Sequence, residues 1–203
     1  MRARGARSGT AVEILDVAER LLQTRGFNGF SYADIASELD ITKPALHYHF
    51  SGKSELGEAL IARYASRFAE ALGAIDNDAP SAPAKLDAYA GLYLDVLRAN
   101  RMCLCGMLAA EYQTLPQSMK AAVIQFFEDS SKWLESVLCD GSADGTLQFV
   151  GSEREVAQLI IGALEGAMLV ARSYGDVGRF EESADRLIAS IARPVETRPK
   201  RAR

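Results

Sequence analysis

The sequence predicts an all-α protein in which a small N-terminal module is joined by one long helix to a larger helical domain. Apolar residues recur at helical spacing in about nine segments, and no segment shows a convincing two-residue alternation. The turn-rich stretch 76–83 is the clearest break in composition. We therefore expect domains over 1–53 and 54–192, followed by a basic, disordered tail over 193–203.

The first helix is predicted to begin at Thr10, because Thr10 and Glu13 have the spacing of a capping box. Gly26 is expected to end this helix. The basic segment 1–9 is expected to be disordered in the free protein. The apolar stripe of the helix consists of Ile14, Leu15, Ala18, Leu21 and Leu22.

Two short helices joined by a tight corner are predicted next. Ser31 followed by Asp34 is an N-cap with an acid in the first helical turn. Asp40 tolerates left-handed backbone geometry and can end that helix. Thr42 is the next N-cap candidate, and Pro44 falls in the first turn, where a missing amide proton costs little.

The second of these helices, over about 42–48, has Leu46 as its inward anchor. A short helix with one apolar anchor is not stable alone, so it must lean on the preceding helix and present its polar side outward. This is the arrangement of a helix-turn-helix recognition helix. The alternative is an ordinary helical hairpin inside an all-α core.

The run from Ile41 to Phe50, ITKPALHYHF, followed by Lys53 and Leu56, resembles the DNA-binding signature of TetR-family transcriptional regulators. The resemblance covers about the first quarter of the chain. It implies a homodimer that binds double-stranded operator DNA, pairs through its last two helices and responds to a small-molecule effector in the larger domain. The chain departs from the usual pattern at Asp40, at Pro44 and at His47, and the last two lie on the expected reading surface.

Within this resemblance, Lys43, His47 and Tyr48 would read bases, while Thr42, Tyr48, His49 and Lys53 would contact phosphates. The basic segment 1–9 is either a DNA-contacting arm or a solvated leader. A metal site at His47 and His49 is disfavoured, because residues two apart on a helix do not share a face. The residues expected at the DNA are Ser31, Thr42, Lys43, Pro44, Ala45, His47, Tyr48, His49 and Lys53.

Four further helices follow from the apolar pattern. The fourth should run over 53–75 and connect the two domains. The fifth should span 83–100, and a short sixth should begin near Cys103 and end before Pro116. The seventh should end near Cys139, before a loop over 140–151 in which 146–149 is briefly extended.

The eighth predicted helix, 153–173, is apolar almost all round, and a ninth follows over 179–192. Apolar surface on two sides requires both a core and a partner, which fits a four-helix dimer interface. The alternative is a central helix buried within one chain. The expected interface residues are Gly162, Gly166, Leu187 and Ile191.

Aromatic and methionine side chains on the inward faces of helices five to eight form either a plain core or the wall of an apolar pocket. Glu165 lies in an apolar run, so its carboxylate should have a partner, either a basic residue across the dimer or a ligand group. The candidate pocket residues are Tyr89, Tyr93, Cys103, Met107, Phe126, Trp133, Glu165 and Met168.

Cys103 supports a second hypothesis, a thiol sensor of electrophiles or oxidants on the same DNA-binding scaffold. It lies at a predicted helix N-terminus beside Arg101, and both features lower a thiol pKa. The apolar neighbours Met102, Leu104 and Met107 favour burial, which raises a thiol pKa. We expect burial to dominate.

The net charge of −4 is unevenly distributed over the 203 residues. Segment 1–9 has three arginines and segment 193–203 has five basic residues against one acid, which leaves 15 basic and 26 acidic residues between them. An acidic body with basic extremities suits a protein that touches DNA locally. No apolar run is expected to span a membrane, so we expect a cytoplasmic protein.

The sequence therefore predicts a ligand-released repressor without a cofactor or metal. An all-α enzyme using Cys103 or Glu165 is the rival from another class, but no nucleophile–base spacing or phosphate loop accompanies them. A DNA-binding architectural protein without a ligand is the third possibility.

Overall fold

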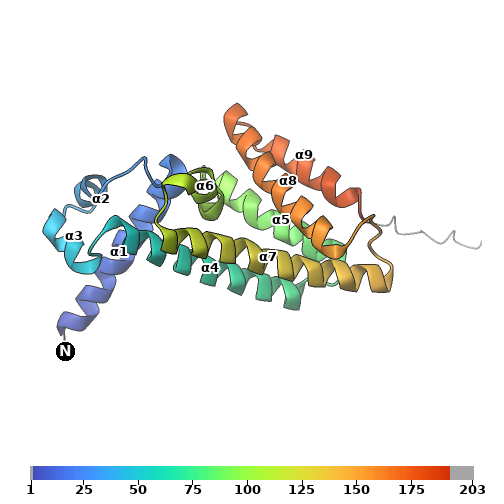
Figure 1. The fold of residues 1–203 in the computed structure, drawn as a ribbon, viewed down its shortest axis with the longest axis horizontal. Helices are drawn as coiled ribbons and strands as arrows, with labels where there is room; N and C mark the ends of the chain where they lie inside the picture. The colour runs from blue at the N-terminus through green and yellow to red at the C-terminus, as the bar shows by residue number, and fades with distance from the viewer. Residues whose placement is uncertain (1, 193–203) are drawn as a thin grey trace, which may run out of the picture.

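The chain divides into the two parts that the hydrophobic pattern predicts (Figure 1). This computed structural model describes residues 2–192, and the described part contains nine α-helices and one short 3₁₀ helix. The predicted tail over 193–203 lies outside the described residues. The division at residues 53 and 54 stays a prediction, since α4 begins at Lys53 and continues into the larger domain.

The N-terminal module contains α1 (Arg2–Arg25), α2 (Tyr32–Glu38) and α3 (Lys43–His49). The prediction that α1 begins at Thr10 and that 1–9 is disordered is wrong for the described residues, because the helix begins at Arg2. The alanines and arginines of this segment have high helix propensity, which offsets Gly5 and Gly9, and the capping box that the helix passes is worth only about 1 kcal/mol.

The helix-turn-helix geometry is confirmed. The Asp34 carboxylate accepts the backbone N–H of Ser31 at 2.7 Å, which completes the predicted N-cap of α2. Asp40 has the expected left-handed backbone, with φ of 52°. Thr42 Oγ1 accepts the backbone N–H of Ala45 at 3.3 Å and so caps α3.

The larger domain is a helical bundle in which α4 and α7 lie side by side, α8 packs on α7, and α9 packs on α8 and α5 (Figure 1). The α7 helix runs well past the predicted end at Cys139, because Gly141 lies inside the bundle. A Cβ at this position would lie 2.5 Å from Leu147 Cδ1 and 2.6 Å from Ala82 Cβ, so glycine here permits close packing rather than ending the helix. The elements of this domain are α4 (Lys53–Asp78), α5 (Ala82–Arg98), α6 (Leu104–Ala110), η1 (Tyr112–Thr114), α7 (Gln117–Asp144), α8 (Glu153–Tyr174) and α9 (Gly178–Ala189).

The loop after α7 is briefly extended, as predicted. An isolated antiparallel bridge joins Leu147 to Ala192, and Gln148 N donates to Ile191 O at 2.7 Å. This bridge ties the α7–α8 loop to the end of the described chain.

Contrary to the expectation from sequence, α8 is long and apolar enough to cross a membrane by length and composition alone. Its packing explains part of that composition, since Ile160, Leu164 and Met168 are buried in the bundle. Leu159 and Leu169 remain exposed, so the helix has a second apolar face in the single chain.

Candidate nucleic-acid interface and candidate cavity site

The outward side of α3 presents the residues predicted from the sequence. Leu46 is fully buried and anchors the helix, whereas Lys43, His47 and Tyr48 are exposed. Thr42 and Pro44 are also exposed, while Ala45 and His49 are half-buried. The short helix therefore has the one-sided anchor that a recognition helix requires.

Four of the predicted residues line one surface hollow of about 380 Å³ between α2, α3 and the start of α4. Lys43 and His47 come from α3, Ser31 caps α2, and Lys53 opens α4. His47 is oriented by Ser51 O, 3.1 Å from its Nδ1, and by the Tyr32 ring, whose centroid is 4.8 Å away.

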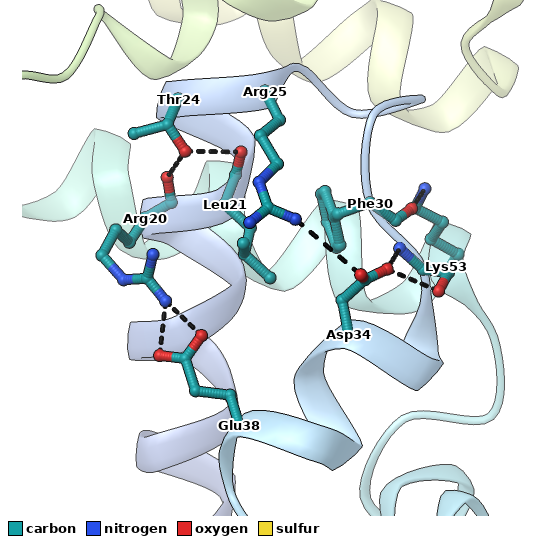
Figure 2. Close-up of polar contacts among 9 residues, drawn as sticks. Arg20, Leu21, Thr24, Arg25, Phe30, Asp34, Glu38 and Lys53 are labelled. Carbon is teal, nitrogen blue, oxygen red and sulfur yellow. Dashed lines mark hydrogen bonds and ion pairs between the residues drawn. The ribbon is translucent and has the colours of Figure 1, made fainter.

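The orientation of α2 is fixed by α1 (Figure 2). Arg20 pairs with Glu38 at the far end of α2, and Arg25 Nη1 lies 3.8 Å from Asp34 Oδ1 at its start. Exposed pairs contribute little stability individually, but two pairs at opposite ends define the angle between the helices.

The ammonium of Lys53 is turned toward the loop between α1 and α2 rather than outward. It donates to the carbonyl oxygens of Phe27 and Phe30 and lies 4.7 Å and 4.3 Å from the centroids of their rings. Figure 2 shows its contact with the Phe30 carbonyl. Partial burial lowers the pKa of Lys53. The phosphate contact expected of Lys53 stays a prediction.

A second hollow, of about 490 Å³, opens between α6, α7 and α8 in the larger domain. Of the eight predicted pocket residues, Met107 and Glu165 line it, and Gly162 from the predicted dimer interface lines it as well. Four further lining residues on α8, at helical spacing around Glu165, include three that were not predicted from the sequence, and Glu165 was the available signal for them; the four are Gln158, Ile161, Gly162 and Leu169. The lining residues are Met102, Gly106, Met107, Ala109, Ala110, Phe127, Gln158, Ile161, Gly162, Glu165 and Leu169.

The other predicted pocket residues do not line this hollow. The Tyr89 and Tyr93 hydroxyls lie 3.0 Å apart inside the bundle, and the Tyr89 ring stacks on that of Trp133 at 5.5 Å. Trp133 Nε1 donates to Asp76 Oδ2 at 2.9 Å. Paired aromatic rings stabilise one another beyond the area they bury, so these side chains form a core. Trp133 is half-buried against this core, and the five buried residues are Tyr89, Tyr93, Cys103, Phe126 and Met168.

Glu165 is the unusual group of the cavity. Its Oε1 is buried and has no hydrogen-bond partner among the described residues. Its Oε2 occupies the space beside Gly106, where any Cβ would collide with it. Burial raises the pKa of Glu165 to about 7, and the interaction with the Cys103 thiol opposes that rise.

Cys103 is closed off from solvent, with 1% of its surface exposed. As the N-cap of α6 its sulfur accepts the Gly106 N–H at 3.4 Å, and the Tyr64 hydroxyl donates to it at 3.7 Å. Burial, followed by the nearby Glu165 carboxyl, raises the pKa of Cys103 well above its usual value. The predicted dominance of burial over the helix N-terminus is confirmed.

The wall of the cavity is tied directly to the C-terminal end of α1. Met102 N donates to Gln23 O at 3.1 Å, and Gln23 Nε2 donates back to Met102 O at 3.1 Å. From α8, Arg172 donates to Gln23 O at 3.2 Å and to Thr24 O at 2.5 Å. Both sides of the cavity therefore hold the same turn of α1.

A further contact joins α6 to the loop that follows α1. The Glu111 carboxylate, at the C-cap of α6, accepts the backbone N–H of Phe27 at 2.7 Å and that of Asn28 at 3.1 Å. Hydrogen bonds to a charged group are stronger than neutral ones. Nothing in the sequence around Glu111 indicates this contact, because its partners lie far away along the chain.

The exposed face of α8 contains the two glycines predicted at the dimer interface. Added Cβ atoms at Gly162 and Gly166 would meet no heavy atom within 4 Å. The same helix exposes Leu159, Leu169 and Val170. Leu187 and Ile191, near the end of the chain, are half-buried against the core. The interface itself stays a prediction.

Two family models match the chain. One, described as bacterial regulatory proteins of the tetR family, matches residues 14–60, and the other, described as a tetracyclin repressor-like C-terminal domain, matches residues 82–187. Together they cover the module with α3 and most of the larger domain.

Solved structures and a curated protein are similar over most of the chain. A TetR-family transcriptional regulator from Agrobacterium tumefaciens is 30% identical, with a TM-score of 0.89 over 92% of this chain and 100% of that one. A TetR transcriptional regulator from Legionella pneumophila is 36% identical, with a TM-score of 0.79 over 88% and 95% of the chains. The HTH-type transcriptional repressor DhaR of Mycobacterium sp. (strain GP1) is 21% identical over 81% of this chain and 83% of its own.

The shifted pKa of Glu165 predicts how stability depends on pH. The folded state binds this proton more tightly than the unfolded state, because the pKa is about 7 rather than the usual 4.5. Ionisation therefore lowers the free energy of unfolding as pH rises from about 4.5 through 7. Glu165→Gln should be more stable than wild type at pH 8, by about 1–3 kcal/mol, and nearly equal at pH 5. Urea denaturation at both pH values measures this.

The exposed Glu182 of α9 provides the control, since Glu182→Gln should not change stability at either pH. An equal stability difference between Glu165→Gln and wild type at pH 5 and pH 8 would contradict the argument.

Proposed function

The chain belongs to the TetR family of bacterial transcriptional regulators, and we propose that it acts as a homodimeric repressor, released from operator DNA by a small-molecule effector. The observation that carries the proposal is the exposed polar face of α3, held by the single buried anchor Leu46. DhaR, similar over most of the chain, is named a transcriptional repressor, which favours repression over activation. A regulator of this kind works in the cytoplasm, where its DNA lies.

At the DNA, Lys43, His47 and Tyr48 are proposed to read base edges in the major groove. Thr42, Tyr48, His49 and Lys53 are proposed to contact phosphates, which fix the register of the helix. Ser31, Pro44 and Ala45 complete the contact surface. The hollow shared by Ser31, Lys43, His47 and Lys53 supports their action as one surface.

Dimerisation through α8 and α9 is supported by the exposed apolar face of α8. Glycines at 162 and 166 leave room for a second helix to approach closely. Leu187 and Ile191 are proposed to extend the interface along α9 and the segment after it. In a dimer, the two α3 helices would occupy half-sites one helical turn of DNA apart, or multiples of about 34–36 Å.

Release is proposed to follow from filling the cavity between α6 and α8. A ligand there would displace Met102 and the start of α6, and with them the paired hydrogen bonds to Gln23 of α1. The hydrogen bonds from the Phe27 and Asn28 amides to the Glu111 carboxylate, here called the Glu111 clamp, would transmit the same motion to the α1–α2 loop. Long α4 also contacts α6 and α7, so it provides a second route to the DNA-binding module. A shift of a few ångströms in one α3 helix breaks simultaneous engagement of both half-sites.

The thiol-sensor alternative is disfavoured by burial of Cys103. A sensing thiol must be exposed and partly ionised at neutral pH. Cys103 is neither, because it is closed off from solvent and burial raises its pKa.

The direct test is a footprint of the purified protein on the DNA upstream of its own gene. Protection of a site with two-fold symmetry is expected. Protection should be lost when an effector found by thermal-shift screening is added. Absence of sequence-specific protection, in a correctly folded dimer, would contradict the proposed function.

Two substitutions separate base contacts from phosphate contacts on that site. His47→Ala should relax specificity at one position of each half-site, at a cost of roughly 1–3 kcal/mol. Lys53→Met should weaken binding to all sequences alike and reduce the slope of log affinity against log salt by about one. Filter binding over a range of salt concentrations measures both effects. An unchanged slope, with a lowered melting temperature, would instead restrict Lys53 to holding the α1–α2 loop.

Assembly is tested by filling the open face of α8. Gly166→Leu should keep the protomer folded, because its Cβ meets no atom within 4 Å and leucine has the higher helix propensity. Overpacking of the dimer should cost about 1–3 kcal/mol and raise the monomer fraction in analytical ultracentrifugation. Gly73→Leu, at an equally open position on α4, is the matched control. A monomeric wild type at micromolar concentration would contradict the dimer.

The coupling route is tested by breaking the Glu111 clamp. Glu111→Ala removes the acceptor for the Phe27 and Asn28 amides, so effector binding should change DNA affinity less than in wild type. Allosteric coupling is typically worth about 1–3 kcal/mol, and we expect a loss of roughly half of it. The measurement is the ratio of DNA dissociation constants with and without the effector. Glu181→Ala, which removes the remote Arg98 pair, should leave that ratio unchanged.

A further inference from the structure

The cavity between α6 and α8 is lined almost entirely by apolar side chains. Apart from Gln158 and Glu165, its lining side chains are apolar or absent. Its volume of about 490 Å³ lies within the range of roughly 300–1,000 Å³ typical of small-molecule sites. A ligand that fits this lining is mostly apolar and has few polar groups.

The carboxyl of Glu165 has no cation beside it. None of the ion pairs among residues 2–192 includes Glu165, and its Oε1 accepts no hydrogen bond there. Arg172, about two helical turns further along α8, donates instead to the carbonyls of Gln23 and Thr24. The titratable groups that interact with Glu165 are all uncharged at neutral pH, because burial raises the pKa of each; they are Tyr64, Tyr89, Tyr93, Cys103 and Cys105.

The fold keeps space for this carboxyl. Gly106, on the opposite wall, is the residue against which Oε2 rests, and any side chain there would push the carboxyl away. A buried carboxylate without a cation beside it is costly, so a cation on a ligand would remove this desolvation penalty as well as form a contact.

We propose that the cavity binds a protonated amine on an apolar body, with its ammonium paired to Glu165 and its body between α6 and α8. This rests on the proposed function, in which the same cavity is the effector site. Met102, Met107 and Phe127 supply adaptable and aromatic surface for the body. Gln158 provides one further polar contact.

Other ligand classes fit less well. A carboxylate or phosphate would be repelled by Glu165 and would meet no basic side chain in the lining. A sugar or polyol would leave most of its hydroxyl groups without partners. A purely apolar molecule would leave the Glu165 carboxyl buried and unpaired.

The test uses three probes that share one apolar body: 4-phenylbutylamine, 4-phenylbutan-1-ol and 4-phenylbutyrate. Titration calorimetry on the DNA-free, full-length protein at pH 8 should rank the amine first and the carboxylate last. Glu165→Gln should weaken amine binding roughly 10- to 100-fold, because the amide oxygen can still accept a hydrogen bond from the ammonium but lacks the opposite charge, and should change alcohol binding little. Gly106→Ala, which displaces the carboxyl, should weaken amine binding as well.

The pH dependence gives an independent readout. The carboxyl must lose its proton to pair with an ammonium, and burial raises the pKa of Glu165 to about 7. Amine affinity should therefore fall as pH drops from 8 to 6, and this fall should be absent in Glu165→Gln. The Glu182→Gln control should behave as wild type at both pH values.

The proposal is overturned by any of three results on folded protein. The alcohol binds wild type as tightly as the amine; Glu165→Gln leaves amine affinity unchanged; or the amine does not bind at millimolar concentration. Operator binding is measured on the same samples without a probe, as a result independent of amine binding. Loss of operator binding with intact amine binding would contradict the proposed function alone, and the converse would contradict the amine site alone.

Discussion

The arrangement of the two parts of this protein depends on the polar contacts that hold the end of α1. Gln23 exchanges two hydrogen bonds with Met102, and Arg172 binds the carbonyls of the same turn. Because these groups are paired across the two parts, the module cannot tilt without breaking them or exposing buried polar atoms. The DNA-binding module is thus held by hydrogen bonds that begin in the walls of the cavity. The proposed ligand signal would reach α3 through these bonds.

The α8 helix serves three surfaces at once. Ile160, Leu164 and Met168 face the core, while Glu165 faces the cavity with Gly162 beside it. Leu159 and Val170 face solvent in the single chain and suit a second copy. A helix that contacts the core, a cavity and a partner is apolar nearly all round. For this reason α8 is also long and apolar enough to span a membrane.

Lys53 shows how one residue can serve both fold and recognition. Its position in the family signature suggests a phosphate contact, yet its ammonium is bound to the carbonyls of Phe27 and Phe30. These contacts hold the loop between α1 and α2, while Lys53 still lines the hollow beside α3. A DNA phosphate would therefore compete with, or share, a cation that already stabilises the module.

The sequence by itself determined the helical class, the helix-turn-helix and the direction in which α3 faces. These features follow from local rules. Ser31 and Thr42 cap the N-termini of α2 and α3, Asp40 forms the turn between them, and Leu46 anchors α3 in the core. Which aromatic side chains form a core and which line a cavity was decided only by tertiary structure. Tyr89 and Trp133 have helical spacing that fits either role, and they stack on each other because the bundle brings α5 and α7 together. The Glu111 clamp and the space that Gly106 leaves for Glu165 join residues far apart in the chain, so no local pattern could reveal them. Glu165 lies between these cases. An acid in an apolar run indicates from the sequence that its carboxyl requires a partner, but only the packing of the helices places that carboxyl at a cavity.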